Sequence, residues 1–367
     1  NLPAGSAGAI VAFSDYTRTF GTNALTITPN GSNKIGGVTA NAKLGVDGQA
    51  TTFVYVDSTE GWINVQNAED TEQGATFIVA TGGTVTCSGN CKIHTFTGPG
   101  TFCVSAISGI AANNQVSYIV VAGGGAGGDA GGRGAGGGGA GGFREDKSPV
   151  TPYTASPLDG AGDITVSATA FPITVGAGGA SRTSPNVGNC GSNSIFSTIT
   201  SAGGGGGGGE GGPAVISIAG GSGGGGGKGC NQGCGANGNT PPVSPPQGNP
   251  GGDGGGGSNP TAAGGGGGGA TAAGGVGSSS DGGAGGAGAT TEINASPTTF
   301  AGGGGGSTSP AGGGNPGPGG GGAGGGFPGP SAVAGTANTG GGGGGAADNA
   351  GGGAGGSGIV IIRYKFQ

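Results

Sequence analysis

Gly203-Gly204-Gly205-Gly206-Gly207-Gly208-Gly209 decides the fold of this chain, and glycine runs at residues 264–269 and 340–345 repeat its composition. The sequence holds 108 glycines in 367 residues, and most of them follow Tyr118. Because glycine has no side chain to bury, an ordinary apolar core cannot form from these runs. The region is therefore either a flexible linker or a body whose backbones bond directly to one another.

Ordering glycine costs so much backbone entropy that a folded glycine-rich body needs many main-chain hydrogen bonds. Fixing one residue costs roughly 1–2 kcal/mol of backbone entropy, and glycine loses more freedom than other residues. Dense hydrogen bonds between segments, each worth about 1 kcal/mol net, can offset this cost. Polyproline II-type helices, with three residues per turn, project their N–H and C=O groups in three directions. With glycine on all three faces, six neighbours can surround each helix. We therefore predict a polyglycine II bundle.

Composition argues against several classes of function. The net charge is −6 and only 8% of residues are charged, without a basic patch, so nucleic acid is not an expected partner. No apolar run is long enough to cross a membrane. Glycine patterns that resemble phosphate-binding loops arise by chance here, and none ends in Gly-Lys-Ser/Thr. The acidic residues are scattered singly, so we expect neither an enzyme nor a cofactor or metal.

Residues 1–68 are predicted to form a β-rich fibre module. Strand-like runs occur at residues 8–13, 24–28, 51–56 and 61–65. The module has few apolar residues for a core, and small domains bury little surface alone, so we expect association with identical chains. Trp62 is expected in the core or in a subunit contact. The chain begins at Asn1 and has no Met, so we read it as a fragment that lacks its N-terminal anchor.

Residues 69–115 are predicted to form a second, linking module. Two runs of β-forming residues, 91–97 and 101–105, flank Gly98-Pro99-Gly100, which predicts a β-hairpin. His94 stands on the first of these strands. We expect it at the surface or in a subunit contact, because its spacing from the nearby cysteines does not suit zinc.

Residues 116–367 are predicted to form the glycine-rich domain. Its first strand, 116–121, and its last, 358–366, are almost continuously apolar, as in strands covered on both faces, so we expect them to lie side by side. Residues 163–166 and 170–175 look like a hairpin, and residues 193–200 like one strand. The predicted class is all-β with a polyglycine II bundle and negligible α-helix.

The six cysteines leave two interpretations open. An even number suits disulfides outside the cell, with 15 possible complete pairings, and free thiols are the alternative. Cys230 and Cys234 are the preferred local pair, because a bridge between them would close a glycine-rich loop. Cys87 and Cys103 are the other disulfide candidates.

Inserts between the glycine runs are the candidates for recognition, since loops on a rigid scaffold can change freely. Residues 143–153 are the most charged stretch of the domain, residues 230–247 are rich in proline, and Phe327 starts a Phe-Pro-Gly-Pro insert. The alternative is that these inserts only connect and seal the bundle. The candidate receptor-binding residues are Phe143, Arg144, Lys147, Tyr153, Asn231, Gln232 and Phe327.

Several phrases of the sequence resemble bacteriophage tail-fibre proteins. The first 68 residues resemble a module of tail fibres of marine phages, through Asp15-Tyr16-Thr17-Arg18-Thr19-Phe20, residues 25–32, Val54-Tyr55-Val56-Asp57 and Gly61-Trp62. Residues 92–102 resemble the segment before the glycine-rich region of such proteins. The glycine-rich domain resembles their C-terminal domain through residues 118–125, 173–179, 202–205 and 355–364.

The resemblance implies a homotrimeric fibre protein of the virion that attaches to the host. Similar glycine-rich bundles occur in the tip adhesins of long tail fibres of T-even-like phages, where loops between polyglycine helices recognise the host. The implied partners are identical chains and a surface polysaccharide or outer-membrane protein of the host. A purely structural extracellular or virion fibre subunit is the alternative function.

Overall fold

The computed structural model is an all-β protein, as the sequence predicts, and its one helical element among the described residues is a short 3-10 turn, η1 (Ala111–Asn114). The chain divides into two compact units, residues 1–76 and 77–367, which are described separately. The structure describes residues 1–68, 77–131, 134–182, 187–209, 216–228, 233–255, 262–309, 312–347 and 351–367.

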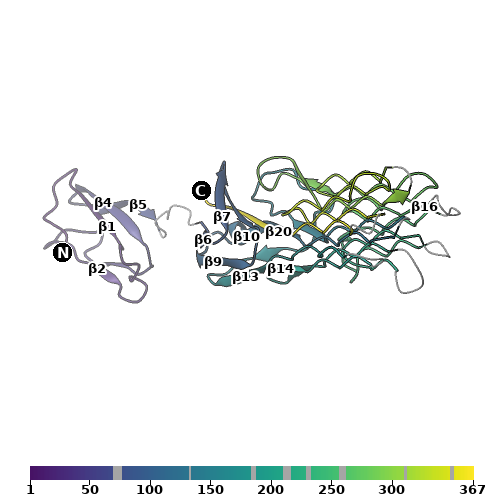
Figure 1. The fold of residues 1–367 in the computed structure, drawn as a ribbon. Coiled ribbons are helices and arrows are strands. Elements are labelled where there is room, and N and C mark those ends of the chain that lie inside the picture. The colour runs from purple at the N-terminus through teal and green to yellow at the C-terminus, as the bar shows by residue number, and fades with distance from the viewer. Residues whose placement is uncertain are drawn as a thin grey trace. The chain divides into compact units, whose positions relative to one another are not determined.

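The first unit is built on a three-stranded antiparallel sheet in the order β1-β4-β5, with a separate β2–β3 pair (Figure 1). Its core contains Leu2, Phe53 and Tyr55 around Trp62, which is fully buried. The core position expected for Trp62 is therefore confirmed. The strands are β1 (Ile10–Ser14), β2 (Leu25–Ile27), β3 (Ala42–Leu44), β4 (Ala50–Asp57) and β5 (Gly61–Ala68).

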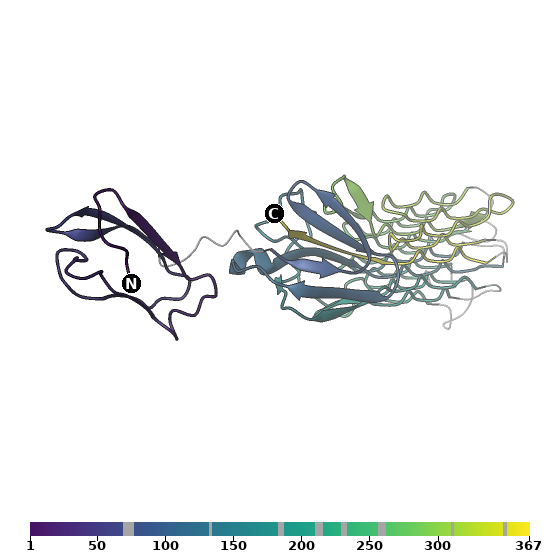
Figure 2. The ribbon, with the colours of Figure 1, turned by 90° about the vertical axis from the view of Figure 1, so that its left-hand side faces the viewer.

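The second unit begins as a β-sandwich, which leads directly into the glycine bundle (Figures 1 and 2). One sheet has the order β11-β10-β20-β8-β7, with β12 also paired to β10, and the other has the order β15-β14-β13-β9-β6. Strands of the first sheet are β7 (Thr84–Ser88), β8 (Cys91–Phe96), β10 (Gln115–Val121), β11 (Phe143–Asp146), β12 (Ile164–Thr165) and β20 (Ile359–Lys365). Strands of the second sheet are β6 (Val79–Thr81), β9 (Gly100–Ala106), β13 (Ala170–Thr174), β14 (Ser194–Phe196) and β15 (Ile199–Ser201).

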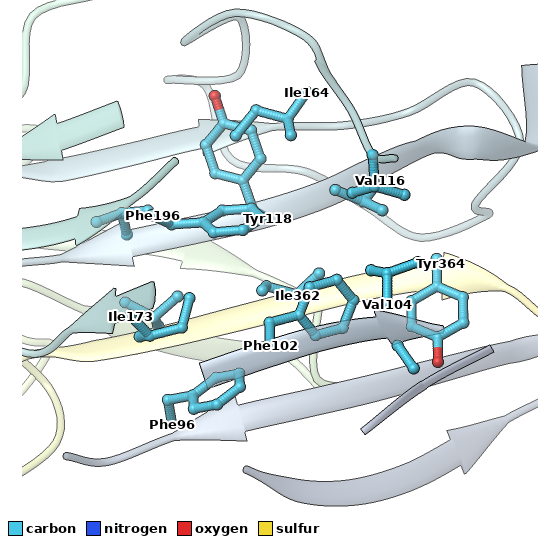
Figure 3. Packing of buried hydrophobic residues seen from close by; sticks show 14 of the residues in the cluster. Phe96, Phe102, Val104, Val116, Tyr118, Ile164, Ile173, Phe196, Ile362 and Tyr364 are labelled. Carbon is cyan, nitrogen blue, oxygen red and sulfur yellow. The ribbon is translucent and has the colours of Figure 1, made fainter. Parts of the chain in front are cut away.

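Strands β10 and β20 lie side by side in the middle of the first sheet, as their apolar sequences predict. They pair antiparallel, with Ile119 opposite Ile361. Tyr118 and Ile362 face the second sheet and pack there with Phe102 and Phe196 (Figure 3). Ile119 and Ile361 face the other way, toward the hairpin of β17 (Ala289–Thr291) and β18 (Thr298–Phe300). Coverage on both faces explains why neither strand alternates with polar residues.

Two predicted hairpins are wrong, for one shared reason. Strands β8 and β9 form no hairpin: β8 pairs with β7 and β20, whereas β9 pairs with β6 and β13 in the opposite sheet. Strand β12 likewise pairs with β10 instead of β13. Turn chemistry between neighbouring strands predicted local pairs, but burial of the alternate apolar residues of each strand favours partners far away in the sequence.

These pairings also correct the predicted domains. Strands from residues 79–106 supply edge and inner strands of both sheets, so residues 77–115 are part of the glycine-rich unit and not a separate linking module. The strand predicted at residues 193–200 is a tight hairpin, β14–β15, whose turn places Ser197 at φ 53°.

Beyond the sandwich, residues 136–142 form the central segment of the bundle, and its hydrogen bonds repeat every three residues. The amides of Gly136 and Gly139 donate to Gly208 and Gly205, which lie on one neighbouring segment. Residues 137 and 140 donate to a second neighbour, and residues 138 and 141 to a third. This threefold repeat is that of a polyproline II-type helix, and it confirms the predicted polyglycine II bundle.

Six segments surround this central segment. Three accept its amide hydrogen bonds and three others bond to its carbonyl groups, with donor–acceptor distances of 2.8–3.0 Å. Neighbouring members of the ring also bond to each other, as in Gly343 to Gly125. The ring consists of residues 122–128, 202–208, 222–225, 265–268, 304–307 and 340–343.

Glycine is required at positions of this lattice where a neighbouring backbone lies very close. A Cβ atom added to Gly137, Gly138 or Gly141 would overlap a backbone carbonyl oxygen of a neighbouring segment. Backbone contacts thus take the place that side chains have in an ordinary core.

Candidate functional site: the distal end of the bundle

The described segments of the bundle run back and forth between the sandwich and the opposite end, near β16 (Ala262–Ala263) and β19 (Thr308–Ser309), which we call the distal end (Figure 1). There, Asp129 forms a bridge with Ala346, and Gly255 donates to Ala263. Turns that are far apart in the sequence therefore lie together on one surface.

Phe327 is the exposed aromatic residue of this end, with 49% of its surface accessible. The amide of Phe327 donates to the carbonyl oxygen of Thr308 at 3.2 Å. The hydroxyl of Ser309 donates to the carbonyl oxygen of Phe327, also at 3.2 Å. Strand β19 therefore holds the backbone of Phe327 while the ring faces solvent. Phe327 is the predicted recognition residue that the structure places in the open.

A turn at residues 278–281 adjoins Phe327 through β19. The hydroxyl of Thr308 donates to the carbonyl oxygen of Ser280 at 3.4 Å. Within the turn, the hydroxyl of Ser278 accepts the amide of Asp281 at 2.8 Å, and all four residues are exposed. We call the exposed residues 278–281 and 327–330, which the buried strand β19 joins, the Phe327 surface.

The Phe327 surface has the chemistry of a binding surface. An aromatic ring can stack on a sugar ring or an apolar group, and the hydroxyls of Ser278–Ser280 with the carboxylate of Asp281 can hydrogen-bond to hydroxyl groups. Among the described residues no three His, Cys, Asp or Glu side chains gather in a way that would hold a metal ion. The residues that the structure describes also include no helix with the length and hydrophobicity of a membrane span.

The prediction that residues 143–153 form an exposed recognition loop is wrong for two of its four candidate residues. Phe143 and Arg144 belong to strand β11, which is buried along its whole length, and Tyr153 is partly buried. Phe143 packs with Ile119 and Ile359 in the sandwich. The charges that suggested an exposed loop are instead held by internal hydrogen bonds at the base of the bundle.

Glu145 is the centre of this buried polar region. Its carboxylate accepts hydrogen bonds from the hydroxyls of Thr291 (2.6 Å) and Tyr153 (3.2 Å) and from the amide of Ser156 (2.9 Å). Burial raises the pKa of Glu145, and these hydrogen bonds oppose that shift. The cluster ties the insert to hairpin β17–β18, so its role is structural.

Arg363 and Lys147 complete the region through contacts with the Tyr153 ring. The guanidinium of Arg363 lies 5.2 Å from the centre of the Tyr153 ring, and the ammonium group of Lys147 lies 5.6 Å from it. Arg363 is buried, whereas Lys147 is half-buried. Sequence reasoning did not single out Arg363, because an apolar strand gives no sign of which loops its charged side chains will contact.

Other predicted residues divide into two groups. Asn231, Gln232 and Cys230 lie outside the described residues, and with them the proposed Cys230–Cys234 pair. Cys87 and Cys103 are free thiols and the structure does not pair them. Phe102 and Val104 face the core, so Cys103, between them on β9, points outward, away from the sheet that contains Cys87.

His94 is buried between the sheets and not at the surface, contrary to expectation. Its Nδ1 lies 2.7 Å from the carbonyl oxygen of Gly82, so this nitrogen carries the proton and donates. Burial lowers the pKa of His94, with a smaller lowering by Lys92 and an opposing effect of the Gly82 hydrogen bond.

The turn at residues 278–281 was missed by sequence reasoning. Its signal is present, since Ser278-Ser279-Ser280-Asp281 interrupts a region in which glycine and alanine dominate. Short polar interruptions of this kind mark turns, but which end of the bundle they occupy follows only from the direction of each segment.

Comparison with known proteins supports the assignment of the glycine-rich unit and adds no functional relative. No match is found among curated proteins. A family model described as a glycine-rich domain matches residues 97–365, which is most of the chain and includes the sandwich strands from β9 to β20. The chain therefore belongs to the glycine-rich domain family.

Proposed function

We propose that the protein is a bacteriophage tail-fibre adhesin that attaches the virion to its host without catalysis. The observation that supports this most is the arrangement of the distal end, where the exposed Phe327 ring lies among polar turns. A bundle that gathers turns at one end suits recognition, because such a scaffold tolerates changes in the turns.

The host ligand that fits the Phe327 surface is a polysaccharide or an extracellular loop of an outer-membrane protein. Stacking on an aromatic ring and hydrogen bonds to hydroxyls suit both. Identical chains are the other proposed partners, as a homotrimer held through residues 1–68, and the proposed location is the tail fibre of the virion.

A structural fibre subunit is the alternative, and the start of the insert at residues 143–163 favours it. Residues 143–146 are buried, and Glu145 among them accepts a hydrogen bond from the hydroxyl of Thr291. In this alternative the distal turns would serve only to reverse the chain.

Binding of the full chain to a panel of bacterial cells tests the proposal. Phe327→Ala should reduce cell-bound protein at least tenfold on a susceptible host. The matched control is Ile110→Ala, which removes another exposed apolar side chain (52% accessible) beside η1, away from the distal end. Equal binding by both variants and the unchanged chain would favour the structural alternative.

A further inference from the structure

Strand β7 is an open edge of the sandwich, whereas the opposite edge of the same sheet is closed. At the closed edge, all four residues of β11 are buried, and the amide of Phe143 donates to the carbonyl oxygen of Gln247. At the open edge, β7 pairs with β8 on one side. On its other side it forms no backbone hydrogen bond with another of the described residues.

Strand β7 lacks every usual protection against pairing with another strand. Its sequence, Thr84-Val85-Thr86-Cys87-Ser88, has no charge and no proline, and its register with β8 has no bulge. Residues 84–87 are exposed, including Val85 at 46%. The neighbouring edge β6, by contrast, is only three residues long and is interrupted by a register shift at Val79. Unprotected edges of this kind pair with other strands.

The position of β7 is fixed before any partner arrives. The chain turns from β6 into β7 through Gly82 and Gly83, both at positive φ. A Cβ atom at Gly82 would overlap the carbonyl oxygen of Thr101, and the carbonyl of Gly82 accepts the Nδ1–H of His94. A fixed edge loses little entropy when it pairs.

We propose that β7 is a pairing edge for β7 of a second copy of this chain, antiparallel and centred on Thr86. In this register Thr86 lies opposite the partner's Thr86, and Val85 lies opposite Cys87 of the partner subunit. One face of the new pair is then apolar and the other carries only hydroxyl groups. Threonine pairs and apolar pairs both stabilise antiparallel sheets, so the edge is complementary to itself.

Because β7 is complementary to itself in this register, a second copy of the chain fits the edge better than an unrelated strand. A two-fold contact uses the same patch on both chains and closes after two members. Five paired residues make a small contact, so we expect a weak, concentration-dependent dimer. The contact is independent of association through residues 1–68 and does not rest on a host-binding role.

Cysteine crosslinking of the full chain tests the register. In a Cys87→Ser background, Thr86→Cys should give a covalent dimer on a non-reducing gel after mild oxidation. Thr84→Cys in the same background is the matched control, because the proposed register places Thr84 opposite the partner's Ser88 and far from the partner's Thr84. Absence of the dimer with Thr86→Cys, or equal crosslinking of both variants, would overturn the proposal.

Sedimentation gives a second, independent readout. Val85→Lys places a charge on the edge and should abolish the concentration-dependent rise in the sedimentation coefficient, with an unchanged melting temperature. Ile110→Lys, at another exposed apolar position (52% accessible), should leave that rise intact. A chain whose association is unaffected by Val85→Lys does not use this edge.

Discussion

The Nε2 atom of His94 lies 3.1 Å from the phenolic oxygen of Tyr364, although 270 positions separate the two residues. Because Nδ1 donates to Gly82, Nε2 is the acceptor of the Tyr364 hydroxyl. The rings are also stacked, with centroids 5.5 Å apart. This pair joins β8 to the last strand, β20, inside the sandwich.

Protonation of His94 should destabilise the protein. Burial lowers its pKa below the ordinary value of 6.5, so the unfolded chain binds a proton more readily than the native state. The contribution of His94 to stability should therefore be complete above pH 6.5 and should be lost as the pH decreases below it. Urea unfolding between pH 5 and 8 measures the trend.

The variant His94→Gln isolates this contribution. It should be less stable at pH 7.5 but should lose the part of the pH dependence that lies just below pH 6.5. An unchanged pH profile in this variant would mean that the histidine is not the titrating group.

Gly138→Ala should strongly destabilise the second unit, because its Cβ atom would overlap the carbonyl oxygen of Gly125. Overpacking of this kind costs about 1–3 kcal/mol or more. Gly312→Ala is the matched control, since a Cβ atom there meets nothing within 4 Å. That substitution should be neutral or stabilise by about 0.4–1 kcal/mol. Similar melting temperatures for the two variants would contradict the lattice.

Composition was sufficient to predict the bundle, because glycine runs leave only main-chain groups to stabilise a folded body. The pairing of β10 with β20 was also predictable from two apolar strands covered on both faces. The ring of six segments around residues 136–142 was not predictable from the sequence. Its members are nearly identical in composition, and only the three-dimensional path of the chain decides which glycine run is central.

The site was predictable only in part. Phe327 was singled out as an aromatic residue in a proline-rich insert, and it is exposed. The same reasoning fails for Phe143 and Arg144, because charge in a short insert does not by itself imply exposure. Hydrogen bonds such as that from Arg144 to the carbonyl oxygen of Ala161 (3.0 Å) satisfy those charges internally, and they depend on tertiary contacts.

Asp146→Asn should change the pH dependence of stability in the opposite direction to His94→Gln. Burial raises the pKa of Asp146 from 3.8 to about 6, with smaller contributions from Asp163 and Asp159 and an opposing hydrogen bond from Gly162. The native state therefore retains a proton that the unfolded chain releases. The contribution of protonated Asp146 to stability is lost as the pH rises from about 4 through 6. An asparagine can still accept the Gly162 amide, so the variant should lack this loss, as urea unfolding at pH 4, 5, 6 and 7 would show.

Arg363→Lys should destabilise the sandwich almost as much as Arg363→Met. The guanidinium donates to the carbonyl oxygens of Pro152 (2.8 Å) and Ile293 (3.2 Å), and so joins two loops to β20. A lysine cannot reproduce this planar fork, and each buried carbonyl left unpaired costs about 1–3 kcal/mol. Full rescue of the melting temperature by lysine would show that only the charge matters.

Thiol reactivity should distinguish three cysteines in the native protein. Cys87 and Cys103 are exposed and free, so both should be alkylated within minutes. Cys91 is buried and should react only after unfolding. Peptide mapping by mass spectrometry identifies the labelled sites, and a peptide linking Cys87 to Cys103 would contradict the structure.

Hydrogen exchange of residues 136–142 tests the central claim most directly, because six neighbouring segments surround them and bond to them through main-chain hydrogen bonds. Mass spectrometry of the full chain at pH 7 should show these amides exchanging as slowly as those of β10 and β20, near the limit set by global unfolding. Exchange at the rate of an unstructured glycine-rich peptide would contradict the account.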